Sequence, residues 1–287
     1  MIMYRLLWGW LFPLLTVAEH EAGEAAGHGA AAGPPELPNA VTVLYGWFQD
    51  NVIVAFLHHW ENVFFAFVVG ATISVFAYFS SRRATVIPRG LQNVMEAIIE
   101  GLDNFFAGIL GPAGRRFTPF LGTLFIYIWC MNLLGLIPLF MSPTGGVKGG
   151  YNITVSLAIC VFLYVQYTGV RQLGLGGYLH HLAGSPTNTV QWLLVPLNLP
   201  IHIIGELAKP LSLSLRLFGN ITGEDVLIAA FVGLGITALS FLHLPIGLPL
   251  HVPFIFLAIL TGTIQALVFT LLSTIYFSMM LPHEEHH

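Results

Sequence analysis

Five long apolar stretches follow one another along this chain, and they limit what it can fold into. A helix that crosses a lipid bilayer needs about 20 predominantly apolar residues. Only 8% of the residues are charged, so a soluble core of this size would lack the polar surface to cover it. We therefore predict an all-α, polytopic membrane protein. Its predicted spans are residues 62–79, 120–141, 153–170, 190–242 and 252–281.

The fourth apolar stretch is much longer than one span and contains Pro196, Pro200 and Pro210. Proline removes a helical hydrogen bond and kinks or breaks a helix. We predict that this stretch is broken at its prolines and re-enters the membrane with the last stretch as a long, tilted, Pro-interrupted helical hairpin. The predicted interruption is correct only if the prolines break the helix; a helix that continues through them would contradict it.

The segment between the first two spans, residues 87–111, has a different pattern. Its apolar residues recur at helical spacing, while the opposite face carries carboxylates and amides. This pattern is typical of an amphipathic helix that lies at the membrane interface or packs on the bundle. The apolar face comprises Leu91, Val94, Met95, Ile98, Ile99 and Leu102, and the polar face comprises Gln92, Asn93, Glu96, Glu100 and Asp103.

The first 58 residues form a separate N-terminal segment in our interpretation, and residues 59–287 form the membrane domain. Residues 1–21 combine one arginine, a short apolar run and an acidic end, which suits a cleaved signal peptide or a segment at the membrane surface. Residues 22–38 are rich in Ala, Gly and Pro and are typical of a flexible linker.

The arginines of the connecting segments indicate the orientation of the chain. They follow the first span, precede the second and follow the third, which places them on one side of the membrane if the spans alternate. Positive residues favour the cytoplasmic side, so we expect the N-terminus outside and the C-terminal sequence HEEHH inside. The arginines are Arg82, Arg83, Arg89, Arg115, Arg116 and Arg171, and Lys148 lies in an opposite loop.

Several kinds of site are not indicated by the sequence. The net charge of −4 provides no basic face for nucleic acid. No Walker A motif or Gly-rich phosphate cradle is present, so we predict no nucleotide site. Cys130 and Cys160 lie in apolar runs without CxxC spacing and are interpreted as small hydrophobic residues. We predict no metal and no cofactor.

Polar residues in the fourth stretch line up along one helical face. At about 100° per residue they fall within roughly a third of the circumference around Arg216, with Ser214 and Asp225 as exceptions. Such a face within a membrane must meet water, another polar surface or an ion path. It is formed by His202, Glu206, Lys209, Ser212, Arg216, Asn220, Gly223 and Glu224.

Arg216 has no carboxylate three or four residues away, only Ser212 and Asn220. Glu206 and Lys209 are spaced to pair, so a structural ion-pair cluster between helices is one reading of the face. The last stretch contains no acid, and its Gln265 can hydrogen-bond a charge but not neutralise it. We predict that the carboxylate facing Arg216 belongs to another protein.

These residues resemble a known family. The segment KPLSLSLRLFGN, with PLNLPIHIIGELA before it and GEDVL after it, is similar to the membrane-embedded a subunit of F-type ATP synthases. FLAILTGTIQALVFTLLSTIYFSMM resembles the last helix of that subunit. FTPFLGTLFIYIWCMNLLGLIPLF resembles an earlier span, with Asn132, Gly135 and Pro138 in the family pattern. The resemblance extends from about residue 60 onward.

The resemblance implies a function and a set of partners. The family's subunit lies beside a ring of c subunits, and two offset half-channels lead protons to the ring carboxylates and away from them. Further partners are b-type peripheral stalk subunits and, through the stalks, the soluble catalytic head. The chain itself is then a non-catalytic, ion-translocating stator subunit in a bacterial inner membrane, with H⁺ as the expected ion.

The resemblance also implies roles for individual residues. Arg216 matches the essential arginine that favours the ionised ring carboxylate and blocks leakage between half-channels. Asn220 and Gln265 match polar residues near it on the same helix and the facing helix. Asp225 matches the family's acid nine residues after the arginine, and with Glu224 it is expected in the outer half-channel. His202, Glu206, Lys209 and Ser212 are expected in the inner half-channel.

One residue departs from the family pattern, and two other classes of protein remain as alternatives. Some members have a histidine seven residues before the glutamine, where this chain has Ala258, so the proton path is expected to use water. The twelve histidines allow a haem-binding membrane oxidoreductase, although the pairs His58–His59 and His180–His181 lie in loops or at helix ends. A secondary transporter would show inverted repeats, and no duplicated half is evident.

Overall fold

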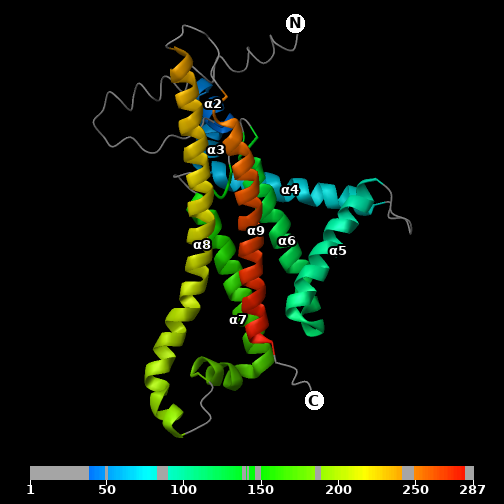
Figure 1. Cartoon of the computed structure of the whole chain (residues 1–287), viewed down its shortest axis with the longest axis vertical. Coiled ribbons are helices and arrows are strands. Elements are labelled where there is room, and N and C mark those ends of the chain that lie inside the picture. Colours follow the sequence, from blue (N-terminus) through cyan, green and yellow to red (C-terminus); the bar gives the residue numbers. More distant parts are fainter. Residues whose placement is uncertain are drawn as a thin grey trace. The chain divides into compact units, whose positions relative to one another are not determined.

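The computed structural model describes residues 39–48, 51–82, 90–137, 140, 142–145, 150–184, 189–240 and 249–281. Every regular element in these ranges is a helix, which confirms the predicted all-α class (Figure 1). The signal-like segment, the linker, Lys148 and the sequence HEEHH lie outside the described residues. The helices are α2 (Ala40–Trp47), α3 (Val52–His59), α4 (Glu61–Ser81), α5 (Leu91–Leu110), η1 (Pro112–Phe117), α6 (Thr118–Leu134), α7 (Gly150–Leu182), α8 (Thr189–Ser240) and α9 (Val252–Met280).

Five described helical segments are long and apolar enough to cross a membrane, as predicted. They coincide with the five apolar stretches, because a continuous run of apolar side chains is stable in lipid only when every backbone group is hydrogen-bonded within its own helix. The chain is therefore a multi-pass helical membrane protein. The spanning segments are Glu61–Ser81, Arg115–Leu134, Gly150–His180, Gln191–Gly235 and Val252–Met280.

The prolines of the fourth stretch do not break it, which differs from the expected interruption. Pro196, Pro200 and Pro210 all lie inside α8, and the helix continues from Thr189 to Ser240. Each proline removes one donor and leaves one carbonyl without its helical partner. The remaining turns keep their hydrogen bonds, so a helix as long as α8 absorbs these local losses.

The helices formed by the second and third apolar stretches do not end where the apolar residues end. Helix α6 stops at Leu134, although the apolar run continues to Met141. Helix α7 instead continues past Val170 to Leu182, with a kink at Gly174, where φ is +70°. Only glycine adopts this backbone conformation without strain, so the helix changes direction there and resumes.

Helix α5 has the predicted amphipathic character. Its apolar residues Val94, Ile98 and Ile99 are exposed, so this face is not covered by the described part of the chain, as expected for a helix at the membrane interface. The helix ends at Gly111, where φ is +70°. The short helix η1 then folds back, and Arg115 pairs with Asp103 at 3.1 Å.

The chain divides into two units, and α4, α6, α8 and α9 each contribute to both. One unit comprises Val69–Cys130, Tyr151–Phe218 and Thr263–His287. Its core contains aromatic rings from η1, α6, α7 and α9, with Phe117 stacked on Phe277 at 4.8 Å and Phe120 edge-on to Tyr164 at 4.8 Å. These contacts join η1 and the start of α6 to the middle of α7 and the end of α9. We call this part the Arg216 unit.

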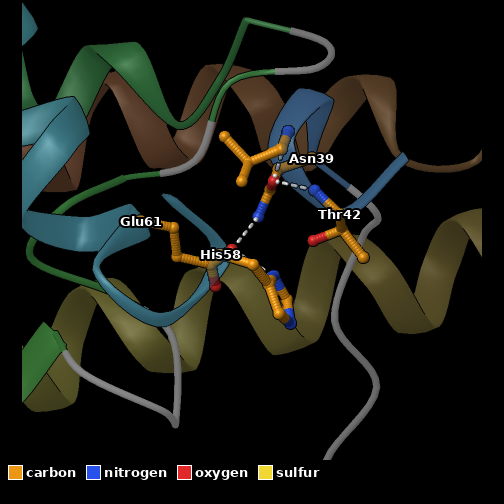
Figure 2. A network of polar contacts seen from close by, with 5 residues as sticks. Asn39, Thr42, His58 and Glu61 are labelled. Carbon is orange, nitrogen blue, oxygen red and sulfur yellow. Dashed lines mark hydrogen bonds and ion pairs between the residues drawn. The ribbon is translucent and has the colours of Figure 1, made fainter. Parts of the chain in front are cut away.

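The other unit comprises Met1–Val68, Met131–Gly150 and Gly219–Gly262, and we call it the Asp225 unit. Its two short helices α2 and α3 were not predicted from the sequence. The Asn39 side chain caps α2 by accepting from the backbone N–H groups of Val41 and Thr42 and donates to Glu61 at 3.3 Å. His58 lies 3.2 Å from the same carboxylate (Figure 2). This network fixes α2 and α3 against the start of α4.

Candidate functional site

Arg216 is exposed on the surface of the Arg216 unit, near the middle of α8. Its neighbours Leu213 and Leu217 are 2% and 0% exposed and bury the adjacent side of the helix. Among the described residues, no carboxylate lies within 4 Å of the guanidinium; carboxylates of described residues instead pair with His58, Arg115 and Lys209. The arginine thus presents its charge outward from the chain, in the middle of a helix that is long enough to span a membrane.

Lys209 has the opposite environment, although it lies on the same predicted face of α8. Its ammonium forms an ion pair with Glu206, and their side chains are only 19% and 13% exposed. The ammonium also lies over the ring of Tyr276 in α9, 5.0 Å from the centroid. Glu206 and Lys209 therefore form the structural ion pair that their spacing indicated. Arg216 is not part of this ion pair.

Two residues of α7 that the sequence analysis did not single out complete this group. Gln166 donates to Glu206 at 3.1 Å, and the Tyr178 hydroxyl donates to Gln166 at 2.5 Å. We call Gln166, Tyr178, Glu206, Lys209 and Tyr276 the Glu206 cluster. The available sequence signal was Gln166, a lone amide in the middle of an apolar run. Its partner Glu206 lies 40 residues away on another helix, so the spacing of residues along one helix could not predict the contact.

The other predicted residues of the Arg216 unit are less closely grouped. His202 is exposed, and its ring contacts the carbonyl of Asn198 one turn earlier, at 3.1 Å. Ser212 is exposed on α8. Gln265 of α9 is 3% exposed and so belongs to the core.

Glu224 and Asp225 of the Asp225 unit point toward different neighbours. The Glu224 carboxylate is half-buried and lies close to the Thr261 side chain of α9, whose hydroxyl donates to the Leu257 carbonyl. Asp225 faces the chain after α6, where its carboxylate closely approaches Gly145. This divergence follows from the 100° turn between consecutive helical residues. Asn220, one turn earlier, is exposed.

The chain after α6 is held by a group of buried polar side chains. Asn132 donates to the Gly262 carbonyl of α9 at 3.0 Å and accepts from Thr144 at 3.0 Å. Ser142 donates to the Met131 carbonyl at 3.2 Å, which satisfies a backbone acceptor at the end of α6. We call Asn132, Ser142 and Thr144 the Asn132 cluster. It explains why α6 ends before its apolar run does, and it brings Gly145 against Asp225.

Gly145→Ala should destabilise the Asp225 unit. A Cβ at this position would lie 2.1 Å from the Asp225 carboxylate and 2.9 Å from the Ile221 side chain. One of these groups must shift, at a cost of about 1–3 kcal/mol typical of overpacking. We expect a lower thermal unfolding midpoint of the purified protein in detergent. Gly108→Ala is the control, because a Cβ there meets nothing within 4 Å; equal midpoints for the two variants would contradict the close approach.

The five spans and the exposed arginine of α8 define a polytopic helical membrane protein with a charged residue inside one of its spanning segments. Comparisons with known proteins make this class specific. Residues 63–278 match the family model of the ATP synthase A chain. The chain is 47% identical over 251 residues to ATP synthase subunit a of Protochlamydia amoebophila, covering 88% of this chain and 91% of that protein.

Two further relatives agree with this match. Subunit a of Oleidesulfovibrio alaskensis is 38% identical, covering 78% of this chain and 87% of its own length. Subunit a of Solidesulfovibrio magneticus is also 38% identical, covering 78% and 85%. The chain therefore belongs to the ATP synthase A chain family, the membrane-sector stator subunit of F-type ATP synthases, which confirms the resemblance.

Proposed function

We propose that this chain conducts protons through two offset half-channels, to and from the carboxylates of a rotating c-subunit ring. The observation that carries the proposal is the exposed Arg216 in the middle of α8, with no carboxylate of the described residues within 4 Å. An unpaired cation at bilayer depth is costly. A carboxylate on a passing ring subunit would compensate that cost.

The proposed mechanism follows from the charge of Arg216. A nearby cation favours the ionised form of a carboxylate, so a ring acid that approaches the arginine releases its proton into the exit half-channel. A bare carboxylate in hydrocarbon is prohibitively costly. The acid must therefore take a proton from the other half-channel before it returns to the lipid. The fixed positive charge also repels protons that would otherwise leak directly between the half-channels.

Other polar residues of α8 and α9 line the path in this proposal. Asn220 and Gln265 accompany Arg216 at the point of proton transfer. Glu224 and Asp225 provide the titratable groups of the outer half-channel. The inner half-channel is lined by His202, Glu206, Lys209 and Ser212. The path on the outer side uses water, because the position of the family's histidine is occupied by Ala258, a buried small residue.

The proposal places the chain in a bacterial inner membrane, with the N-terminus outside and the C-terminus in the cytoplasm. This orientation is supported by the arginines that flank the spans on one side. The ring, the b-type peripheral stalk subunits and, through the stalks, the soluble catalytic head are the expected partners. ATP is then made on those partner subunits and not on this chain.

Affinity purification of the chain in mild detergent tests the assembly. We expect the c ring, the stalk subunits and the catalytic head to co-purify, and the complex to hydrolyse ATP. A preparation without the ring would contradict the proposal. An optical spectrum of the same sample would reveal haem if the chain belonged to an oxidoreductase, and we expect no haem absorption.

Gln265→Leu should weaken coupling without abolishing it. The side chain is 3% exposed, and in this proposal its amide supplies a hydrogen bond to the reacting groups, which is worth about 1 kcal/mol, or about a fivefold change in rate. ATP-driven proton uptake by inverted membrane vesicles, followed with a pH-sensitive dye, provides the measurement. A loss as complete as that of an Arg216 variant would show that the amide, and not only the charge, is essential.

A further inference from the structure

Lys209 and Arg216 are two cations on one face of α8. They are separated by seven residues, which is about two helical turns or 10 Å along the axis. A carboxylate that passes along this face would be attracted by either cation if both were free. A second free cation would hold the ionised acid in a second position and slow its release. The proposed function thus requires that only one of the two charges acts on the ring.

The two cations have different surroundings: Lys209 is paired and largely buried, whereas Arg216 is exposed. Lys209 pairs with the Glu206 carboxylate, and the two side chains are 19% and 13% exposed. Its ammonium also lies over the Tyr276 ring at 5.0 Å. Arg216 is exposed and interacts electrostatically with the Tyr276 side chain. The positive charge of Lys209 is therefore compensated within the chain, whereas that of Arg216 faces outward.

Glu206 is itself fixed in place from α7. One carboxylate oxygen accepts from Lys209 and the other accepts from Gln166 at 3.1 Å. Gln166 is oriented in turn by the Tyr178 hydroxyl at 2.5 Å. The pocket beside the pair is lined otherwise by Tyr276 and by apolar side chains. Because the Lys209 and Glu206 side chains are only 19% and 13% exposed, water screens their charges less than it would at an open surface.

We propose that Glu206 acts as a charge lock: supported by Gln166 and Tyr178, it keeps Lys209 in a neutral pair, so that Arg216 alone attracts the ring carboxylate. The inference rests on the proposed function and refines the inner half-channel. Glu206 and Lys209 then form part of the channel wall, and Glu206 is a positioning residue that acts through Lys209. It is not required as a proton carrier.

A double-mutant cycle separates the charge lock from a proton-carrying role. Glu206→Gln removes the negative charge and leaves Lys209 as a free cation, so we expect ATP-driven proton pumping to fall by about tenfold. The same substitution in a Lys209→Met background should change pumping by less than about twofold, because no cation remains to be released. Pumping is measured in inverted vesicles and normalised to the amount of assembled complex.

Two outcomes of this cycle would overturn the inference. A tenfold loss from Glu206→Gln in both backgrounds would show that Glu206 is needed for itself, as a proton carrier is. Unchanged pumping in both backgrounds would show that Lys209 needs no lock. Glu100→Gln is the matched control for the substitution, because this glutamate is exposed on α5, and we expect it to leave pumping unchanged.

A second variant covers the case in which Glu206→Gln prevents assembly. Gln166→Leu keeps the glutamate but removes its support from α7, and we expect a severalfold loss of pumping that Lys209→Met suppresses. A loss that Lys209→Met does not suppress would overturn the charge lock. Arg216→Ala in the same vesicles tests the underlying function separately: if it pumps, the proposed function fails, and if it does not pump while the cycle shows no coupling, only the charge lock fails.

Discussion

Arg216→Ala should abolish ATP-driven proton pumping while the detached soluble head continues to hydrolyse ATP. Removal of the guanidinium deletes an attraction of about 4 kcal/mol for charges about 4 Å apart near a protein surface. A loss of that size corresponds to at least about a hundredfold in rate. No described carboxylate lies within 4 Å of this cation, so the substitution leaves no unpaired acid inside the chain. The complex should therefore assemble normally.

The measurement compares proton uptake and ATP hydrolysis in the same vesicles. Arg82→Ala is the control, because this arginine is exposed just after α4 and outside the polar face of α8. We expect the control to pump normally. Retained pumping in Arg216→Ala, with the c ring present in the purified complex, would remove the role assigned to the motif.

The second large effect is expected from the two acids after Arg216. Glu224→Gln combined with Asp225→Asn removes both titratable groups proposed for the outer half-channel, and we expect pumping to fall by more than about tenfold. Each single variant should retain part of the activity. The reason is structural: Glu224 contacts Thr261 of α9, whereas Asp225 approaches Gly145 after α6, so the loss of one acid leaves the surroundings of the other unchanged.

Pumping in vesicles and passive proton conduction through membranes stripped of the head both report on this path. The matched control is Glu96→Gln combined with Glu100→Gln on α5, which removes two exposed carboxylates outside the proposed path. Pumping of the double variant at the control level would contradict the assignment of the outer half-channel. A single variant as inactive as the double variant would assign the role to that acid alone.

Much of the architecture could be predicted because it depends on short-range patterns. A run of apolar residues of bilayer length specifies a spanning helix, and the five spans follow this rule. The amphipathic period of residues 91–110 specifies α5. The helical period likewise placed Arg216 among polar residues on one face of α8. These features depend only on residues within a few turns of one another.

The boundaries of the helices were less predictable, because hydrophobicity alone does not determine them. Helix α6 ends at Leu134, within an apolar run, since Ser142 and Thr144 fold back onto its last turns. Helix α8 continues through its prolines, and α7 continues past Gly174 with a kink. In each case the outcome depends on which partners the freed backbone groups find.

By itself, the sequence determined the class of protein, the spans and the charged face, because these follow from the period and the solvation cost of neighbouring side chains. The spacing of Glu206 and Lys209 along α8 already indicated that these two residues pair. Only the tertiary structure decided which residues of other helices hold that pair. Lys209 is neutralised through Glu206, which Gln166 on another helix holds, and no spacing within α8 encodes that partner. Pairings between distant segments depend on how helices pack, and packing is a property of the whole fold.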